Sequence, residues 1–391
     1  MRTTADVVII GGGVMGASIA FHLASRGVTN VVLLEAKNLA AEGTGHSGAL
    51  VRQHYSQDVV TRIALRSVEI FEQFEGLTGR RGVFHQTGWI KLGTPAMRSS
   101  MERLIERHRR IGVDVRTLSL SELEAAIPGI NVEGIGAALI EPRGGHADPV
   151  ATTLGFAEAA RARGVEINRR TAATGIHTRD GKVVAVDTAA GAVQTPTIVD
   201  AAGPWGARIA SWVGVEVPIQ VTREQDIVLA GDDDAIMPRI PVSNGVDRDY
   251  WRREDGVRLL VGDGHPKDIE VADPDDFNRR ADAAYEKMIM GRLQHRLPAF
   301  AAQARIDGGY ASLYDVTPDW HPVLGRVPEV DGFLLCLGFS GHGFKLGPAV
   351  GELMAQEIID GRASTIDISS LRLSRFAEGK PLQGAYAGNQ A

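Results

Sequence analysis

The sequence of 391 residues predicts an α/β protein with a second domain of the α+β class. A short apolar run at residues 6–10 leads through closely spaced glycines into a helix, the order typical of a parallel α/β unit. Residues 197–214 and the segment from about residue 325 repeat this strand–glycine–helix order, whereas residues 221–324 are mainly strands. We therefore expect a discontinuous domain of residues 1–80, 146–220 and 325–391, and a second domain of residues 81–145 and 221–324.

A glycine motif opens the first domain. Gly11, Gly13 and Gly16 have G-x-G-x-x-G spacing, between the first strand and a helix expected over residues 14–26. Such glycines permit a tight turn, a close approach of backbone to a pyrophosphate, and close packing of helix on strand. Glu35 ends the next strand, where a carboxylate can bind ribose hydroxyls. The motif predicts a Rossmann-like dinucleotide-binding domain; it leaves NAD and FAD open, and Glu35 disfavours NADP.

The remaining elements carry recognisable start and stop signals. A helix is expected over residues 58–75, followed by a strand at "GWIKLG" and a helix over residues 97–111. Ser121 and Glu124 have the spacing of a capping box, and Asp148-Pro149 supplies an N-cap and an N1 proline for the next helix. Further elements are expected as helices over residues 150–163 and 277–293 and as strands over residues 165–169 and 183–188.

Composition excludes several classes of protein. The formal net charge is −6 and no basic run is present, which argues against nucleic-acid binding. Cys336 is the only cysteine, so an intramolecular disulfide is impossible, and its apolar neighbours favour a buried thiol. Beyond the N-terminal motif no apolar stretch reaches the ~18 residues of a membrane span. We expect a cytoplasmic protein that binds neither membrane nor metal, with an oligomer possible.

Four further motifs make the chain recognisable. They are "GTGHSGALVRQHY" followed by "ALRS", then "VDAAGPW", "YDVTPDWHPVLG" and "GFSGHGFKLGPAVGE". In this order they resemble the D-amino-acid-oxidase-like (DAO) family of FAD-dependent amine oxidoreductases, in particular its sarcosine oxidase and N-methyl amino acid oxidase branch. The resemblance implies FAD rather than NAD, a mainly antiparallel sheet over the substrate, and oxidation of a C–N bond.

The resemblance also implies how FAD is held. The last strand would deliver Gly341, His342 and Gly343 to the flavin edge, where a larger side chain would collide. The helix that follows would aim its N-terminal amides, with Lys345, at the negative charge of the reduced flavin. The expected FAD-binding residues are Gly11, Gly13, Val14, Met15, Gly16, Glu35, Ala36, Gly45, His46, Ser47, Ala202, Gly203, Trp205, Gly341, Gly343, Phe344 and Lys345.

Substrate binding is expected at two cations. Arg52 and Lys345 match the positions that hold the substrate carboxylate in this branch, and a guanidinium suits a carboxylate because it can form two parallel hydrogen bonds. A solvated Arg52 is the alternative. Tyr250, with Trp251, could wall the substrate or simply pack in the core. Arg52, Lys345 and His342 are the candidate catalytic residues, and Arg52, Tyr250 and Lys345 the candidate substrate-binding residues.

The chain also departs from its relatives. His46 matches a histidine that bonds flavin covalently in dimethylglycine-dehydrogenase-like proteins, although its neighbours differ and a hydrogen-bonding role is the alternative. Ser312 replaces the flavin-linked cysteine of monomeric sarcosine oxidases, which excludes that linkage. Leu260 stands near the position of their oxygen-activating lysine, with Arg258 and His265 as candidate substitutes. The electron acceptor, dioxygen or a carrier protein, therefore stays open.

The expected reaction is oxidation of an amino acid, most simply a secondary amine such as an N-substituted glycine, by hydride transfer to flavin and hydrolysis of the imine. One alternative is an oxidase or dehydrogenase of glycine or D-amino acids. Another is a non-catalytic FAD-binding subunit that relays electrons in a larger complex. A third, an NAD dehydrogenase, is disfavoured by glycine loops at both ends of the chain.

Overall fold

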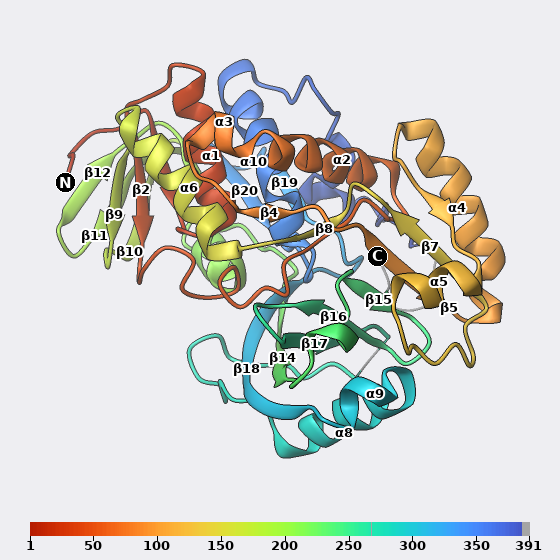
Figure 1. The fold of residues 1–391 in the computed structure, drawn as a ribbon. Helices are drawn as coiled ribbons and strands as arrows, with labels where there is room; N and C mark the ends of the chain where they lie inside the picture. The colour runs from red at the N-terminus through yellow and green to blue at the C-terminus, as the bar shows by residue number, and fades with distance from the viewer. Residues whose placement is uncertain (267, 385–391) are drawn as a thin grey trace.

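The computed structural model describes residues 1–266 and 268–384 and contains two large sheets (Figure 1). The first sheet has six strands, and β1, β2, β9, β13 and β20 run parallel while β19 is antiparallel. This sheet confirms the predicted α/β class. In spatial order its strands are β19 (Val323–Arg326), β20 (Phe333–Leu337), β13 (Ile198–Asp200), β1 (Val7–Ile10), β2 (Val31–Glu35) and β9 (Glu166–Arg169).

Both faces of the six-stranded sheet are covered, which is why its strands read as continuous apolar runs. In β1, Val7 and Ile9 face a cluster with the helices, whereas Val8 and Ile10 face a cluster with a three-stranded antiparallel sheet. That sheet lies at the left of Figure 1. The covering elements are α1 (Val14–Ser25), α6 (Pro149–Ala162) and α10 (Gly343–Asp360) on one face, and β10 (Ala173–Arg179), β11 (Lys182–Thr188) and β12 (Gly191–Gln194) on the other.

The second large sheet has eight strands and lies below the first in Figure 1. All neighbouring pairs are antiparallel except β15 with β5, which confirms a mainly antiparallel second sheet. The helices α8 (Ala283–Arg296) and α9 (Pro298–Ala301) pack Ile289, Leu293 and Phe300 against it. In spatial order the strands are β18 (Arg305–Val316), β14 (Gln220–Ala230), β17 (Arg258–Asp263), β16 (Asp249–Arg253), β15 (Val242–Asn244), β5 (Trp89–Gly93), β7 (Ala137–Glu141) and β6 (Arg116–Thr117).

The chain passes repeatedly between the two sheets. Strands from residues 89–141 and 220–316 build the eight-stranded sheet, and the proposed domain boundaries at residues 80, 145, 220 and 324 stay a prediction. The remaining elements are a small antiparallel sheet of β3 (Leu50–Val51), β8 (Gly145–Ala147) and β4 (Phe84–His85), and the helices α2 (Asp58–Glu72), α3 (Phe74–Thr78), α4 (Arg98–Ile111), α5 (Leu120–Ala126), α7 (Gly206–Ser211), α8 (Ala283–Arg296) and α9 (Pro298–Ala301).

Helix caps show where local signals were and were not sufficient. The Asp148 side chain accepts a hydrogen bond from Ala151 N, so the predicted start of α6 is confirmed. The predicted capping box at Ser121 and Glu124 is wrong, because Ser119 and Glu122 form it two residues earlier. The Ser-x-x-Glu spacing occurs twice in this segment, and the first serine precedes the helix.

Close packing of α1 on α10 joins the two ends of the chain. A Cβ atom added at Gly351 would lie 2.1 Å from Ser18 Oγ and 2.6 Å from the Ser18 carbonyl carbon, so the helices approach too closely for a side chain there. Ser18 Oγ also donates a 3.2 Å hydrogen bond to the Pro348 carbonyl, which ties the two helices together. One turn earlier, Gly347 faces Val14 in the same way.

We predict that Gly351→Ala lowers the free energy of unfolding by about 1–3 kcal/mol, because α1 and α10 must move apart. Thermal denaturation followed by circular dichroism measures the effect. Gly291→Ala is the matched control, since a Cβ at this exposed position of α8 meets nothing within 4 Å and alanine favours helix. Equal melting temperatures for Gly351→Ala and the unchanged protein would contradict the packing argument.

Candidate functional site

A cavity of about 580 Å³ lies between the two large sheets. Its floor is formed by the segments that follow β1, β2, β13 and β20, at the carboxyl ends of the parallel strands. Ligands of open α/β sheets bind at this edge. Its roof includes Trp89, Lys91, Ser243 and Tyr250 from three neighbouring strands of the second sheet, β5, β15 and β16.

The glycine motif forms one end of the cavity. Gly11 has a φ of +114°, and a Cβ there would lie 2.4 Å from the Ala201 carbonyl oxygen. Glu35 Oε2 accepts a 2.7 Å hydrogen bond from Gly12 N, which places the carboxylate at the glycine loop. The first helix has no acidic residue in its first turn, and Thr44 Oγ1 accepts a 3.1 Å hydrogen bond from Val14 N. This arrangement keeps the positive end of α1 at the cavity, as a pyrophosphate requires.

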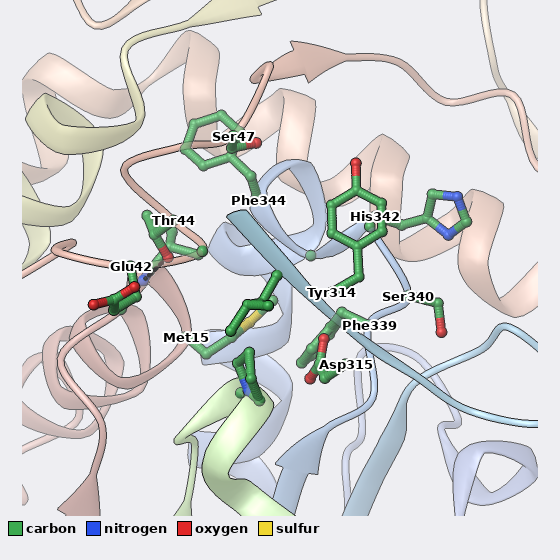
Figure 2. Close-up of a pocket in the computed structure, with 18 of the residues that line it drawn as sticks. Met15, Glu42, Thr44, Ser47, Tyr314, Asp315, Phe339, Ser340, His342 and Phe344 are labelled. Carbon is green, nitrogen blue, oxygen red and sulfur yellow. Dashed lines mark hydrogen bonds between the residues drawn. The ribbon is translucent and has the colours of Figure 1, made fainter. Parts of the chain in front are cut away.

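The segment between β20 and α10 forms the other end. Figure 2 shows Met15 from the first motif and Tyr314, His342 and Phe344 around the same space. Gly341 has a φ of +80°, and a Cβ there would lie 2.3 Å from the Tyr314 ring. The sequence explained Gly341 by an approach to flavin alone; the structure shows that Tyr314 also requires the missing side chain.

Asp315 fixes this segment from below. Its Oδ2 accepts a 2.7 Å hydrogen bond from Gly338 N, and its backbone carbonyl accepts one of 3.1 Å from Ser340 N. Burial raises the pKa of Asp315 to about 6, against the opposing effect of the bonds from Gly338 and its neighbours. The loop that precedes α10 is therefore anchored on a carboxyl group of the eight-stranded sheet.

Arg52 and Lys345 both line the cavity. The Arg52 guanidinium lies 4.3 Å from the centre of the Tyr55 ring and 5.6 Å from that of Trp89, and it donates a hydrogen bond to the His54 carbonyl. Two aromatic faces thus orient the cation. Burial, with the positive charge of Arg52 second, holds the pKa of the Lys345 amine well below its usual range.

His342 and Tyr250 line the same cavity. Burial, followed by the charges of Lys345 and Arg52, holds the pKa of His342 well below its usual range, so its imidazole is neutral at physiological pH. The Tyr250 hydroxyl donates a 2.5 Å hydrogen bond to Asp226 Oδ1, which fixes the ring in the roof. Both side chains can therefore contact a ligand through packing and neutral hydrogen bonds rather than through a formal charge.

Three of the predicted FAD-binding residues do not line the cavity. A Cβ at Gly16 would lie 2.0 Å from Gly11 O, and one at Gly45 would lie 2.2 Å from Ala40 O, so these glycines serve backbone packing. His46 Nδ1 lies 3.0 Å from the Glu42 carbonyl oxygen, and its ring packs on Tyr310. The predicted residues that line it are Gly11, Gly13, Val14, Met15, Glu35, Ala36, Ser47, Arg52, Ala202, Gly203, Trp205, Tyr250, Gly341, His342, Gly343, Phe344 and Lys345.

Other assignments are corrected by burial. Trp251 is fully buried in the core beneath the second sheet, so it is not part of a substrate wall. Leu260 is buried but does not line the cavity, and Arg258 forms an ion pair with Asp307 at 3.1 Å away from the cavity lining. Of the two candidate substitutes for the oxygen-activating lysine, His265 alone lines the cavity.

The sequence interpretation missed Thr44, Lys91 and Tyr314, which line the cavity as well. Thr44 lies inside the motif "GTGHSGALVRQHY", and its hydroxyl could have been recognised as a cap for Val14. Lys91 lies within "GWIKLG", where alternation with Ile90 and Leu92 marks it as facing away from the core. No local signal indicated that this face would meet the cavity.

The geometry fits a flavin dinucleotide. Helix α1 presents its N-terminus at one end, Glu35 stands at the adjoining strand end, and the second helix α10 begins at the opposite end beside the buried Lys345. These are the features that a pyrophosphate, a ribose and an electron-accepting ring would require. In the part of the chain that the structure describes, no helix has both the length and the apolar composition of a bilayer span.

Fold and cavity together define a dinucleotide-dependent oxidoreductase. The chain belongs to the DAO family of FAD dependent oxidoreductases, whose pattern matches residues 6–357. This confirms the family, the cofactor FAD and the enzyme class predicted from the motifs. The NAD dehydrogenase alternative is accordingly excluded.

Individual relatives give the same result. The chain is 31% identical over 394 residues to mitochondrial sarcosine dehydrogenase of Mus musculus, covering 96% of this chain and 42% of that protein. It is 28% identical over 384 residues to the formaldehyde-forming 4-methylaminobutanoate oxidase of Paenarthrobacter nicotinovorans, covering 96% and 46%. The chain thus spans less than half the length of these relatives.

A solved structure matches over the whole chain. L-proline dehydrogenase from P. horikoshii superposes with a TM-score of 0.91 at 25% sequence identity, covering 98% of this chain and 100% of that one. The likeness confirms the arrangement of the two sheets.

A cluster of three buried polar residues lies near Arg52. His54, His108 and Glu141 each offer a ligand atom, and these atoms lie within 4.8 Å of one another. His108 Nε2 is already bonded to the Tyr55 carbonyl at 2.8 Å, and Glu141 Oε2 accepts a 2.6 Å hydrogen bond from Gln53 N. Backbone hydrogen bonds thus already use one side-chain atom of each of these two residues, and we assign no metal here.

We predict that Glu141→Gln becomes stabilising relative to the unchanged protein as pH rises. Burial raises the pKa of Glu141 to about 7, whereas in the unfolded chain the group titrates near ~4.3. The folded protein keeps this proton longer than the unfolded chain does, so the stability it contributes is present at low pH and is lost as pH rises through 7. Melting temperatures of both proteins between pH 5 and pH 8 test this, and a difference independent of pH would contradict it.

Proposed function

We propose that this protein catalyses FAD-dependent oxidation of the C–N bond of a secondary amino acid of the N-substituted glycine class. One observation carries the proposal: the aromatic-held Arg52 and the buried Lys345 face the same cavity as the dinucleotide glycine loop. Paired cations beside an electron acceptor suit a small anionic reductant. The 31% identity to a sarcosine dehydrogenase supports the same substrate class.

Arg52 and Lys345 would hold the substrate carboxylate. The guanidinium can form two hydrogen bonds with it, and its contact with Tyr55 and Trp89 limits how far the cation can move. Fixing the carboxylate places the amine-bearing carbon at one position in the cavity, and positioning of this kind supplies much of an enzyme's rate. Bound FAD would supply the oxidant for that carbon; water then converts the imine product into a carbonyl compound and the shorter amine.

The same charges would select the neutral amine. A protonated amine would be repelled by Arg52 and Lys345 in a cavity where burial limits screening by water. His342, neutral in its buried position, can accept or donate a hydrogen bond without adding charge. A strong base is therefore unnecessary, because the substrate loses its proton on entering the site.

The electron acceptor is proposed to be dioxygen or a carrier protein. Leu260, near the position of a lysine that promotes oxygen reaction in related oxidases, is buried and does not line the cavity. His265 does line it and is the remaining candidate. From the sequence alone, we propose a cytoplasmic protein.

We predict that Arg52→Ala raises the Michaelis constant for sarcosine while bound FAD is retained. Loss of a charge-assisted hydrogen-bond pair costs about 1.5–3 kcal/mol, or ~10- to 150-fold. Steady-state kinetics measure the constant, and the visible spectrum measures FAD content. Arg62→Ala, at an exposed position of α2, is the matched control and should change neither.

An unchanged Michaelis constant for Arg52→Ala would end the carboxylate assignment. Substrate choice separates the remaining alternatives: faster turnover of glycine or D-amino acids than of sarcosine would favour a primary-amine enzyme. Failure of every amine to bleach the flavin anaerobically, without partner proteins, would favour an electron-relay subunit instead.

We also predict that FAD is released by acid precipitation. His46 would have to leave the Glu42 carbonyl and the Tyr310 ring to reach the cavity and bond the flavin. Yellow colour in the supernatant is the expected result. Colour that stays in the precipitate, and is lost in His46→Ala, would instead assign a covalent linkage to this histidine.

A further inference from the structure

A third cation lines the cavity from its roof. Lys91 lies on β5, between Ile90 and Leu92, which are fully buried in the core of the second sheet. Side chains alternate along a strand, so Trp89 and Lys91 share the opposite face. Both residues line the cavity.

Lys91 is the first member of a row of side chains that crosses the roof. It pairs in register with Ser243 on β15, and Ser243 pairs with Tyr250 on β16. All three residues line the cavity. The next position along the row is Gly262, where a Cβ would lie 2.2 Å from the Tyr250 ring, so the tyrosine occupies that space. The row thus sets an amine, a hydroxyl and a phenol side by side over the ligand.

The hydroxyl group of Ser243 is oriented so that it can donate a hydrogen bond to an anion. Trp89 Nε1 donates a 3.2 Å hydrogen bond to Ser243 Oγ, which occupies an acceptor position of that hydroxyl. Its own O–H is then directed elsewhere and can donate to a ligand. Lys91 and Ser243 together offer a charged and a neutral donor at one point of the roof.

The three cations share one electrostatic environment. Burial lowers the pKa of Lys91 to about 8, and the charge of Arg52 contributes second; the same two causes lower the pKa of Lys345. Arg52 thus lies near enough to both lysines to be repelled by them. A single substrate carboxylate offsets only one of these three charges.

Two acidic residues of the lining, Asp249 and Asp263, belong to a different row of the roof. Asp249 and Asp263 pair with each other in register, and with Asn244 and Leu92 they form the neighbouring row, whose side chains alternate to the other face. Asp263 binds Arg292 at 2.6 Å. Their charge is directed toward the α8 side of the sheet rather than toward Lys91.

We infer that Lys91, with Ser243, forms a second anion subsite, so that the preferred substrates are secondary amino acids with a second carboxylate on the other arm of the amine. This inference rests on the proposed oxidation of a secondary amino acid and narrows its substrate class to N-carboxyalkyl amino acids. Arg52 and Lys345 hold one carboxylate, and Lys91 holds the other. Lys91 is accordingly a specificity-determining residue.

Kinetics with two matched substrates test the subsite. Iminodiacetate differs from sarcosine by one carboxylate in place of a hydrogen on the N-methyl carbon. The unchanged protein should oxidise iminodiacetate with a kcat/KM about tenfold or more above that for sarcosine. Lys91→Met should remove this preference through the Michaelis constant for iminodiacetate, whereas Lys91→Arg, which keeps the charge, should retain most of it. Lys287→Met, at an exposed position of α8, is the control for loss of one positive charge.

Binding without turnover provides an independent measurement. Thiodiacetate and methylthioacetate carry sulfur in place of the amine and differ by the same carboxylate. Calorimetry on the FAD-loaded protein should show tighter binding of thiodiacetate, and Lys91→Met should weaken it about tenfold while leaving methylthioacetate unchanged.

The outcomes separate the two proposals. A preference for sarcosine over iminodiacetate, or an equal effect of Lys91→Met on both thioethers, would overturn the subsite and leave amine oxidation intact. Selective binding of thiodiacetate without oxidation of either amine would support the subsite and overturn the proposed reaction.

Discussion

Close contact between the first and last long helices is the constraint on which the site depends. Gly347 and Gly351 on α10 lie against Val14 and Ser18 on α1, with no room for a side chain between them. Because of this contact, the N-termini of two helices more than 300 residues apart in sequence open onto one cavity. A larger residue at either glycine would move Lys345, two residues before Gly347, away from the dinucleotide motif.

The cavity gathers positive charge in a place where water screens it poorly. The aromatic neighbours of Arg52 compensate part of the hydration that its guanidinium loses on burial. Each pKa unit by which a lysine is lowered corresponds to about 1.4 kcal/mol of disfavoured charge. Lys345 and Lys91 therefore carry an unfavourable interaction that an anionic ligand relieves. Substrate binding energy would come largely from this relief, so affinity and selection of neutral amine have one electrostatic origin.

Buried carboxyl groups support this arrangement. Asp315 holds the loop that leads into α10 through Gly338, and Asp226 holds the Tyr250 ring in the roof. Glu141 accepts from the backbone of Gln53, next to Arg52 in the chain. Each group belongs to the eight-stranded sheet but restrains a cavity-lining residue or its neighbour. The second sheet is thus a support for the cofactor end as well as a roof over the substrate.

The sequence alone determined the family, the cofactor and many of the residues that line the cavity. Gly11, Gly13 and Glu35 lie within one strand–helix–strand unit, so their roles follow from local spacing. Arg52 and Lys345 were found because they lie inside motifs of the resemblance, and both line the cavity. Patterns of this kind can be recognised in the sequence because the residues that form them lie close together in the chain.

Only the tertiary structure decided which faces meet. Tyr250 lines the cavity, whereas its neighbour Trp251 lies in the core. The two differ because successive side chains of a strand point to opposite faces of the sheet. His46 lies outside the lining although it adjoins Ser47, which is within it. Lys91 reaches the site because β5 pairs with β15, where its partner Ser243 is 152 residues later in the chain. Register between distant strands depends on the whole packed sheet, and no short stretch of sequence records it.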